Sequence, residues 1–548
     1  MKRDDDDFDY IVVGGGSAGC VLAARLSEDP ACRVLLLEAG GPDKHPYLKM
    51  PVAFLKAMID PRFGWGYFSE PEPHLGNRPL WLPRGKVLGG SSSINGMFYM
   101  RGHPLDFDGW RDLGCAGWSY ADVLPYFKRM ERSWRGASDF HGDSGPLPVQ
   151  SIDTTLLLHE QLMSAGAATG HQLSADINGA RPEGFSKGET TIDRRGRRAS
   201  TSAAYLRPAL GRPNLTVRLR ALTHKVVIER GRAAGVKYEH EGVLRTTRAA
   251  REVILSAGAF NSPHLLMLSG VGPARELQSH GIQVQADLPG VGRNLSEHPT
   301  VMMEFAATRP VTFLKQLRMD RLARHAMNWA VFGRGPMATQ INSCNMIIRT
   351  RPELKQPDIQ LMGNPIRFDA KPWFPGLTRR QGHVFSLGVV ILHPYSRGHI
   401  SLKSADPRTL PGIHMNLFSD QRDFETLRNG IREARRVYRS GDQAALTGHE
   451  LQPGEEAQSD AELDDYIRKN AVVCQHPVGT CSMGVGPDAV VDPQLRVIGI
   501  DGLRVVDASV MPTVPGANTN AATIMLAEVA ADLLRGRKLP AEAAPWAA

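Results

Sequence analysis

Residues 9–38 read DYIVVGGGSAGCVLAARLSEDPACRVLLLE, and this stretch decides the fold. The compact apolar run at 10–13 predicts a buried parallel strand. Residues 18–26 repeat apolar side chains at helical spacing, and a second buried strand is predicted at 34–37. The strand–helix–strand order predicts an α/β fold that begins with a βαβ unit.

The turn between the first strand and the helix is Gly14-Gly15-Gly16-Ser17-Ala18-Gly19, which matches G-x-G-x-x-G. Its glycines let the backbone approach a pyrophosphate, and the helix N-terminus then offers free N–H groups and a favourable dipole. Glu38 follows about 20 residues on, where a carboxylate can accept hydrogen bonds from ribose hydroxyls. The residues predicted to bind a dinucleotide are Gly14, Gly16, Ser17, Ala18, Gly19 and Glu38. The alternative is a glycine turn that only packs the helix against the strand.

This fingerprint occurs once in the chain and does not by itself separate NAD from FAD. An enzyme that passes electrons from flavin to nicotinamide would usually have two such fingerprints. A single one at the start of a chain with a discontinuous domain favours bound FAD.

A chain of 548 residues is too long for one simple core. Segments that resemble the first α/β domain recur in the middle and at the end, whereas the region between them has more prolines and mixes strands with helices. We predict a discontinuous Rossmann-like FAD-binding domain at residues 1–300 and 466–548, with cofactor-covering loops at about 43–195. An α+β substrate-binding domain with a mostly antiparallel sheet is predicted at 301–465.

The composition is that of an ordinary globular protein, with 42% apolar and 22% charged residues and a net charge of +8. Without a dense Lys/Arg helix or aromatic-basic interleaving, we predict no nucleic-acid partner. The six cysteines form no CxxC pair, which favours a reducing compartment and predicts no metal site. The start, MKRDDDDFDY, lacks an apolar signal region, and no run approaches the ~20 apolar residues of a membrane span. We expect a cytoplasmic protein, and peripheral membrane contact stays open.

Two further motifs are Gly/Ser- and Asn-rich. In PRGKVLGGSSSINGMFYMRG, residues 83–102, the glycines and serines predict a hydrogen-bonding loop that can approach a ring or a phosphate. In GAFNSPHLLMLSGVG, residues 258–272, an Asn-Ser cap followed by Pro263 at the first helical position is a sufficient structural explanation. The arginine run at 194–198 could bind phosphates or form a solvated turn.

The C-terminal block contains VVCQHPVGTCSMG, residues 472–484, and then NTNAATIMLAEVAADLL, residues 518–534. Alcohol oxidation needs a base near neutral pH, and His476 is the natural candidate. The helix that begins near 518–520 would offer free N–H groups to the anionic reduced flavin. Asn520 can hold the substrate oxygen together with His476, while ordinary helix capping is the alternative for Asn518 and Asn520.

These four blocks, in this order, resemble the glucose-methanol-choline (GMC) oxidoreductase family over nearly the whole chain. PRGKVLGGSSSING is similar to the first family signature and GAFNSPHLLMLSGVG to the second. HPVGTCSMG and NTNAATIMLAE resemble the choline and aliphatic-alcohol dehydrogenase members. The resemblance implies His476 as the base and Asn520 as its partner. The further cofactor contacts that it implies are Val87, Gly90, Ser91, Asn95, Gly96, Phe98, Thr223, Asp507, Ala508, Asn520 and Ala521.

Three departures from the family pattern affect these expectations. The usual valine that contacts adenine is replaced by Thr223, and a backbone contact would survive that change. Members with covalently bound flavin often have a histidine where this chain has Ile94, so we expect non-covalent FAD. Many relatives have an aromatic residue where this chain has Gln475, which changes the expected shape of the substrate pocket.

The predicted function is FAD-dependent oxidation of an alcohol CH–OH group to an aldehyde or ketone, with hydride passing to flavin N5. The electrons would then reach a non-nicotinamide acceptor: a quinone, a redox protein or oxygen. The alternatives are an oxidase of the same fold that makes hydrogen peroxide, a choline dehydrogenase, and a non-redox flavin-dependent lyase. Trp65 and Tyr67 are candidate aromatic walls for choline, although both could be core residues.

Overall fold

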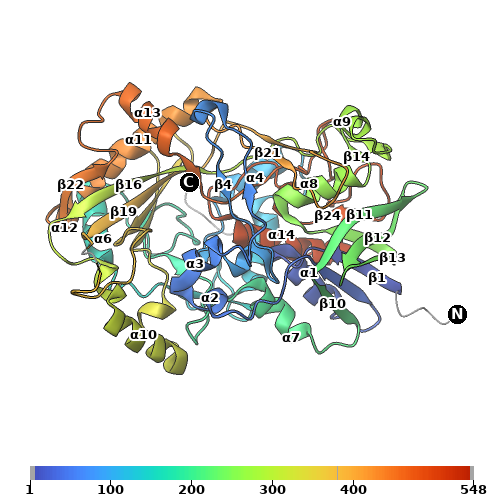
Figure 1. Cartoon of the computed structure of the whole chain (residues 1–548), viewed down its shortest axis with the longest axis horizontal. Coiled ribbons are helices and arrows are strands. Elements are labelled where there is room, and N and C mark those ends of the chain that lie inside the picture. Colours follow the sequence, from blue (N-terminus) through green and yellow to red (C-terminus); the bar gives the residue numbers. More distant parts are fainter. Residues whose placement is uncertain (1–6, 379–380, 543–548) are drawn as a thin grey trace.

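The computed structural model describes residues 7–378 and 381–542, and its two large sheets lie at opposite ends of the molecule (Figure 1). The Asp run at residues 4–7 is predicted from the sequence to be a frayed, solvated tail; residues 4–6 lie outside the described residues, and Asp7 is the first residue of β1. The first sheet has seven strands, in the order β10-β2-β1-β13-β12-β11 with β24 beside β13. Their bounds are β1 Asp7–Val13, β2 Val34–Glu38, β10 Leu215–Leu219, β11 Ala221–Glu229, β12 Arg232–His240, β13 Val243–Leu255 and β24 Leu503–Val505.

The parallel part of this sheet is the predicted βαβ unit with three added strands, β10, β13 and β24. Strand β1 pairs with β2 and β13, and β10 and β24 extend the parallel set on either side. Helix α1, Ser17–Leu26, connects β1 to β2. Val13 pairs with Leu37, so the glycine turn and Glu38 leave the sheet at the same carboxyl edge. Ligands of open α/β sheets bind outside that edge.

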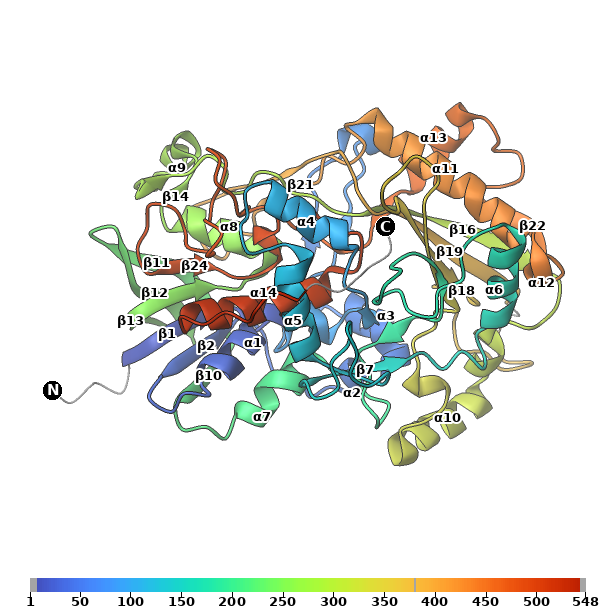
Figure 2. The same ribbon diagram turned by 180° about the vertical axis from the view of Figure 1, so that it is seen from behind.

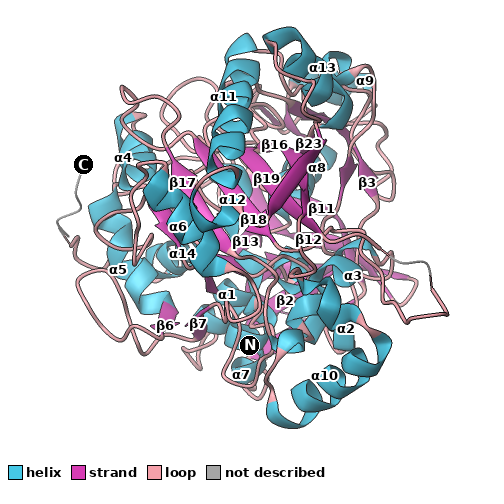
Figure 3. Cartoon of the chain, turned by 90° about the vertical axis from the view of Figure 1, so that its left-hand side faces the viewer, coloured by secondary structure: helices cyan, strands magenta, loops and turns pink. Residues whose placement is uncertain are grey.

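The second sheet is antiparallel, in the order β22-β16-β19-β18-β17-β8 with β23 beside β16. The bounds are β8 Gly184–Ser186, β16 Pro299–Ala307, β17 Cys344–Ile348, β18 Ile359–Asn364, β19 Val384–Ile391, β22 Thr447–Gln452 and β23 Val472–Val473. Helix α11, Gln421–Tyr438, covers one face of it with a buried apolar stripe (Figure 3). Strands β8 and β23 join this sheet from outside residues 301–465. The predicted limits of the two domains stay a prediction.

Shorter elements cover the space between the sheets. The helices are α2 Pro46–Lys49, α3 Phe54–Ile59, α4 Pro104–Asp112, α5 Tyr120–Met130, α6 His159–Ala168, α7 Arg207–Ala209, α8 Gly258–Leu268, α9 Ala274–Ser279, α10 Met319–Phe332, α12 Gly441–Ala444 and α13 Asp460–Asn470. The short strands are β3 Tyr67–Phe68, β4 Trp81–Leu82, β5 Phe98–Tyr99, β6 Glu131–Ser133, β7 Leu147–Ser151, β9 Glu189–Thr190, β14 Val271–Gly272, β15 Ala286–Asp287, β20 His399–Ser401 and β21 Gly412–His414. No helix in the described part of the chain is long and apolar enough to cross a bilayer.

Helix α14, Thr519–Leu534, runs beside α1 through the interior (Figure 2). Its side chains from Ala521 to Asp532 are buried, which explains why the sequence is apolar all round. The buried carboxylate of Glu528 lies 2.8 Å from Arg25 of α1 and 2.8 Å from Arg129 of α5. A buried charge is tolerated only when it is paired, so these contacts hold α14 against α1 and α5. They thereby help to fix the position of α14 in the molecule.

Candidate active site

A cavity of about 1100 Å³ lies between the carboxyl edge of the first sheet and the second sheet. It exceeds the ~300–1,000 Å³ typical of pockets for drug-sized ligands, so it can take a dinucleotide. The predicted site residues that line it are Gly14, Gly16, Ser17, Ala18, Glu38, Gly90, Ser91, Asn95, Gly96, Phe98, Thr223, His476, Asp507, Ala508 and Asn520. Three others, Gly19, Val87 and Ala521, are packed behind that lining.

Glu38 marks the nucleotide end of the cavity. Its two carboxylate oxygens accept hydrogen bonds from the backbone N–H groups of Gly15, at 2.8 Å, and Gly40, at 2.7 Å. Each oxygen keeps a second lone pair, so the carboxylate can still accept ribose hydroxyls. Burial raises the pKa of Glu38 to about 7.

Two glycine turns meet in one wall of the cavity. A Cβ on Gly90 would lie 2.7 Å from the Cα of Gly16, which is closer than real Cβ contacts. The first turn is equally tight, because a Cβ on Gly19 would lie 1.8 Å from the carbonyl oxygen of Gly14. Gly19 therefore packs α1 against the turn, while Gly14 and Gly16 form the cavity surface.

Buried polar atoms without a hydrogen-bond partner in the described chain are spread around the cavity. They are Arg78 Nε, Thr223 Oγ1, Ser256 Oγ, His264 Nε2, Gln340 Oε1 and Asn518 Oδ1, and all six residues line the cavity. An unpaired buried polar group costs about 1–3 kcal/mol, so such groups normally have partners. A long ligand with hydroxyl, phosphate and ring polar groups, such as FAD, fits this distribution.

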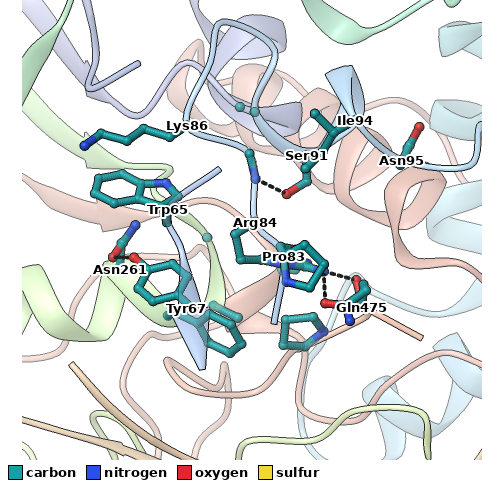
Figure 4. Close-up of a pocket in the computed structure, with 18 of the residues that line it drawn as sticks. Trp65, Tyr67, Pro83, Arg84, Lys86, Ser91, Ile94, Asn95, Asn261 and Gln475 are labelled. Carbon is teal, nitrogen blue, oxygen red and sulfur yellow. Dashed lines mark hydrogen bonds between the residues drawn. The ribbon is translucent and has the colours of Figure 1, made fainter. Parts of the chain in front are cut away.

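The loop of residues 83–102 is held from behind by Arg198. The Arg198 guanidinium donates to the Asn95 carbonyl at 2.6 Å and to Asn95 Oδ1 at 2.7 Å. Ser91 Oγ accepts from the Gly85 N–H, and Figure 4 shows Ser91, Ile94 and Asn95 at the edge of the cavity. Arg198 is 5% exposed and does not line the cavity. This member of the arginine run therefore supports the loop rather than a phosphate.

Helix α8 differs from its prediction. It begins at Gly258, and Pro263 lies inside it rather than at its first position. A proline in a helix interior leaves the carbonyl four residues earlier without its usual donor. That carbonyl belongs to Ala259, and the Thr480 hydroxyl donates to it at 2.6 Å. The expected Asn-Ser cap is wrong, because the helix has already begun at Gly258. Thr480 of the HPVGT segment supplies the hydrogen-bond donor that Pro263 lacks.

Ser262 and Asp507 link the second motif to the C-terminal block. Asp507 Oδ2 accepts from the Ser262 hydroxyl at 2.5 Å and from the Gly258 N–H at 2.8 Å. The other oxygen accepts from the Ser509 N–H at 2.8 Å. These bonds fix Ala508 at the cavity wall, close to the start of α14.

His476 lies where the cavity meets the second sheet. Its Nε2 is 3.0 Å from Asn518 Nδ2, and its Nδ1 is 3.0 Å from Nδ1 of His298. An amide nitrogen can only donate, so Nε2 of His476 is the acceptor and its proton resides on Nδ1. His476 then donates from Nδ1 to His298.

The partner of His476 is thus Asn518, where the sequence analysis expected Asn520. Asn520 Oδ1 instead accepts a hydrogen bond from the Ser17 hydroxyl at 2.8 Å. Asn520 lies in the first turn of α14, so its side chain leaves the helix toward Ser17 of α1 rather than toward His476. Asn518 precedes the helix in extended conformation and makes no side-chain cap, because its carboxamide bonds to His476.

Charged groups surround His476. Glu297 Oε1 accepts from the backbone N–H groups of His298 at 2.8 Å and His476 at 2.7 Å. Arg84 donates to the Gln475 carbonyl at 2.8 Å and to Gln475 Oε1 at 2.9 Å (Figure 4). These bonds hold Gln475 at φ +69°, a left-handed conformation uncommon for a residue with a side chain.

The pKa values follow from this enclosure. Burial, together with the positive charge of Arg84, lowers the pKa of His476 to about 3. Burial also lowers the pKa of Arg84 to about 10, so it stays a cation at neutral pH. His476 is therefore a neutral imidazole whose Nε2 lone pair accepts from Asn518 and can take a proton when a ligand oxygen replaces that bond.

The start of α14 completes the site. Asn518, Thr519 and Asn520 all line the cavity, and the first turn has no acidic side chain. Its free N–H groups carry partial positive charge, which stabilises an anion placed against them. Among residues 7–378 and 381–542, no cluster of side chains could hold a metal ion.

Comparison with known proteins agrees with this geometry. The GMC oxidoreductase family profiles match residues 8–300 and 394–527. The chain is 45% identical over 543 residues to an oxygen-dependent choline dehydrogenase of Sinorhizobium medicae, covering 98% of each chain. It is 43% identical to the protein of the same name from Brucella canis, covering 97% of this chain and 96% of that one.

Solved structures give the same result. A pyridoxine 4-oxidase from Mesorbium loti superposes with a TM-score of 0.86 at 31% identity, over 97% of this chain and 100% of that one. A formate oxidase superposes with a TM-score of 0.90 at 28% identity, over 97% and 99%. The chain belongs to the GMC oxidoreductase family. It is an FAD-dependent enzyme that oxidises alcohol groups, as the sequence resemblance implied.

Proposed function

We propose that His476 is the base that takes the hydroxyl proton of the alcohol. The observation that carries this proposal is the hydrogen-bond chain from Asn518 through His476 to His298, because it leaves the Nε2 lone pair of a neutral imidazole at the cavity. A proton received at Nε2 would make His476 a cation. Bound FAD supplies the acceptor for the hydride that leaves the neighbouring carbon.

Asn518 is the proposed second contact of the substrate oxygen. Its Nδ2 donates toward His476 Nε2, so an oxygen that enters between them can accept from Asn518 and donate to His476. Its Oδ1 is buried without a partner and is available to a ligand. Asn520, which bonds to Ser17, is proposed to hold α14 against α1 beside the cofactor.

We propose that the cofactor is held without a covalent bond. Ile94 lines the cavity at the position where covalent relatives have histidine, and an aliphatic side chain offers no nucleophile. Acid precipitation of the protein should release all of the yellow flavin into solution. Flavin that stays with the precipitate would contradict this.

The electron acceptor is proposed to be a quinone, a redox protein or oxygen. The chain has one dinucleotide fingerprint, which argues against a second, nicotinamide site. The relatives named oxygen-dependent choline dehydrogenases favour oxygen among these acceptors. Hydrogen peroxide formed at the rate of alcohol turnover would identify an oxidase, and turnover that needs an added quinone would identify a dehydrogenase.

We propose a cytoplasmic location with peripheral membrane contact through α10. This helix exposes Met327, Val331 and Phe332, each at least 65% exposed, and it carries Arg321 and Arg324. Apolar side chains beside arginines suit the surface of an anionic bilayer. Co-sedimentation with anionic vesicles, lost in the double variant Met327→Ser/Phe332→Ser, would support this, and equal sedimentation of both proteins would contradict it.

Anaerobic addition of alcohols to the purified yellow protein tests the proposed function. For at least one alcohol, we expect the yellow absorbance of the oxidised flavin to bleach until the spectrum is that of reduced flavin. An aldehyde or ketone should form at the same time. A flavin that no alcohol reduces would contradict alcohol oxidation and favour a non-redox lyase.

A further inference from the structure

We propose that the substrate is an uncharged alcohol with an apolar body, and that the site disfavours quaternary ammonium alcohols such as choline. This inference rests on the proposed function, since it concerns the alcohol that reaches His476. It differs from what the names of the relatives say of those proteins. The reasons are the charges and the aromatic faces that line the cavity.

Cations lie near the reacting position. Arg84 bonds to Gln475, the residue next to His476, and remains protonated at neutral pH with a pKa of about 10. Lys86 and Arg78 also line the cavity. Figure 4 shows Lys86 alongside the Trp65 ring and Arg84 between Tyr67 and Gln475. A second cation brought to this region would be repelled, because charges in an enclosed site are poorly screened.

The carboxylates that could compensate are elsewhere or already bonded. In the described part of the chain, the acidic residues lining the cavity are Glu38, Glu239 and Asp507. Glu38 and Asp507 bind backbone N–H groups at the nucleotide wall, and Glu239 of β12 pairs with Arg408 at 2.6 Å. None of these three belongs to the second sheet. A quaternary ammonium group would therefore meet no carboxylate on that side of the cavity.

Glu297 is the carboxylate nearest to His476, and it does not line the cavity. It is 2% exposed and accepts the two backbone N–H groups behind His298 and His476. Burial raises its pKa to about 7, while the nearby Arg84 and the two backbone N–H groups act in the opposite direction. It cannot reach a ligand as a counter-ion.

The candidate aromatic walls are occupied by protein groups. Trp65 and Tyr67 stack on each other, with ring centroids 5.9 Å apart and an interplanar angle of 19°. Lys86 Nζ lies 4.6 Å from the Trp65 ring centroid. The hydroxyl of Tyr67 donates to Asn261, and the edge of Phe260 packs on its ring. To make a cation–π contact with this face of Trp65, the ammonium group of choline would have to displace Lys86.

The wall on the second sheet is apolar and adaptable. Met302 of β16 and Met362 of β18 line the cavity on either side of Gly388, with Phe368 and Ile341 nearby in the lining. Methionine side chains are flexible and polarizable, so they can pack against apolar groups of varied shape. Such a wall binds a hydrocarbon chain or ring better than a hydrated cation.

The decisive experiment compares choline with 3,3-dimethylbutan-1-ol, which has the same shape and a neutral carbon in place of the ammonium nitrogen. Anaerobic stopped-flow gives the second-order rate constant for flavin reduction by each alcohol. We expect the neutral compound to react at least tenfold faster than choline. An equal or higher constant for choline would overturn the inference and leave the proposed function intact.

Two other outcomes are also decisive. Reduction by a different uncharged alcohol, with choline at least tenfold slower, would support the inference. A flavin that no charged or uncharged alcohol reduces would contradict the proposed function and, with it, this inference.

A lysine variant tests the electrostatic cause. In Lys86→Gln, the ratio of the choline constant to that of the neutral alcohol should rise at least threefold. Lys225→Gln, which changes an exposed lysine of β11 outside the cavity, should leave that ratio within twofold of the parent. An unchanged ratio in Lys86→Gln would show that the charge of Lys86 does not repel choline.

Discussion

His298 Nδ1 lies 3.0 Å from His476 Nδ1, and Glu297 Oε1 accepts the backbone N–H groups of both histidines. The three residues come from segments almost 180 positions apart in the chain. Because His298 must accept the Nδ1 proton, it fixes both the tautomer and the ring orientation of His476. His298 is 0% exposed, and burial keeps its pKa well below the ordinary histidine value, so it is neutral when it accepts this proton.

Replacing His298 should therefore slow the reaction without emptying the flavin site. His298→Leu removes the acceptor, and we expect at least a tenfold lower rate of flavin reduction with little change in bound FAD. His298→Gln offers a carbonyl oxygen to the same proton and should recover much of that loss. Stopped-flow rates for both variants check this. A leucine variant as fast as the glutamine variant would show that the ring has no positioning role.

Substitutions of Asn518 and Asn520 should have different effects, although the two residues are only two positions apart in the sequence. Asn518→Ala removes the amide that bonds to His476, and we expect about a tenfold to hundredfold lower reduction rate with FAD retained. Asn520→Ala removes the bond to Ser17 and should mainly weaken FAD retention. Reduction rates corrected for flavin content separate the two effects. The opposite pattern would restore Asn520 as the partner of His476.

These two asparagines illustrate what the sequence could predict. The block that contains them was identifiable, since an Asn-rich helix start after a His-Pro-Val-Gly segment is a strong local signal. Which asparagine meets His476 depends on how α14 is placed against its neighbours, and the ion pairs of Glu528 with Arg25 and Arg129 contribute to that placement. Tertiary ion pairs of this kind leave no local pattern.

The centre of the first sheet was predictable, because β1, β2 and the end of β13 contain continuous apolar runs and the first turn has fixed glycine spacing. The Ala259–Thr480 bond was not, because it joins a proline in one motif to a hydroxyl in another. His298 and Glu297 were also missed. In sequence they are an ordinary Glu-His-Pro, and only the pairing of β23 with β16 brings them beside His476.

The contact between the two glycine turns gives a prediction on cofactor binding. Gly90→Ala places a Cβ 2.7 Å from Gly16 Cα, at a residue with φ +54°, so the turns must separate. We expect this variant to purify with much less FAD than the parent, measured as the ratio of flavin to protein absorbance. Gly41→Ala is the control, since its Cβ would meet nothing within 4 Å. Full flavin content in Gly90→Ala would mean that the wall tolerates the change.

The charge of Arg84 predicts a pH effect. Burial, with Arg84, holds the pKa of His476 near 3, and only the neutral imidazole can accept a proton. Activity is therefore present above that pKa and lost as the pH falls through it, so the acid limb should lie well below the ordinary value of ~6.5. Arg84→Gln removes a positive charge that disfavours the imidazolium, and the limb should move to higher pH by about one unit. A shift to lower pH, or none, would contradict this electrostatic account.

The assignment of His476 as the base is tested most directly by His476→Ala, measured as the anaerobic rate of flavin reduction by the best alcohol. General-base catalysis by a positioned residue contributes ~10²–10⁴-fold, so we predict at least a hundredfold slower reduction with FAD still bound. A variant that keeps its flavin and reduces it at the parent rate would contradict the account.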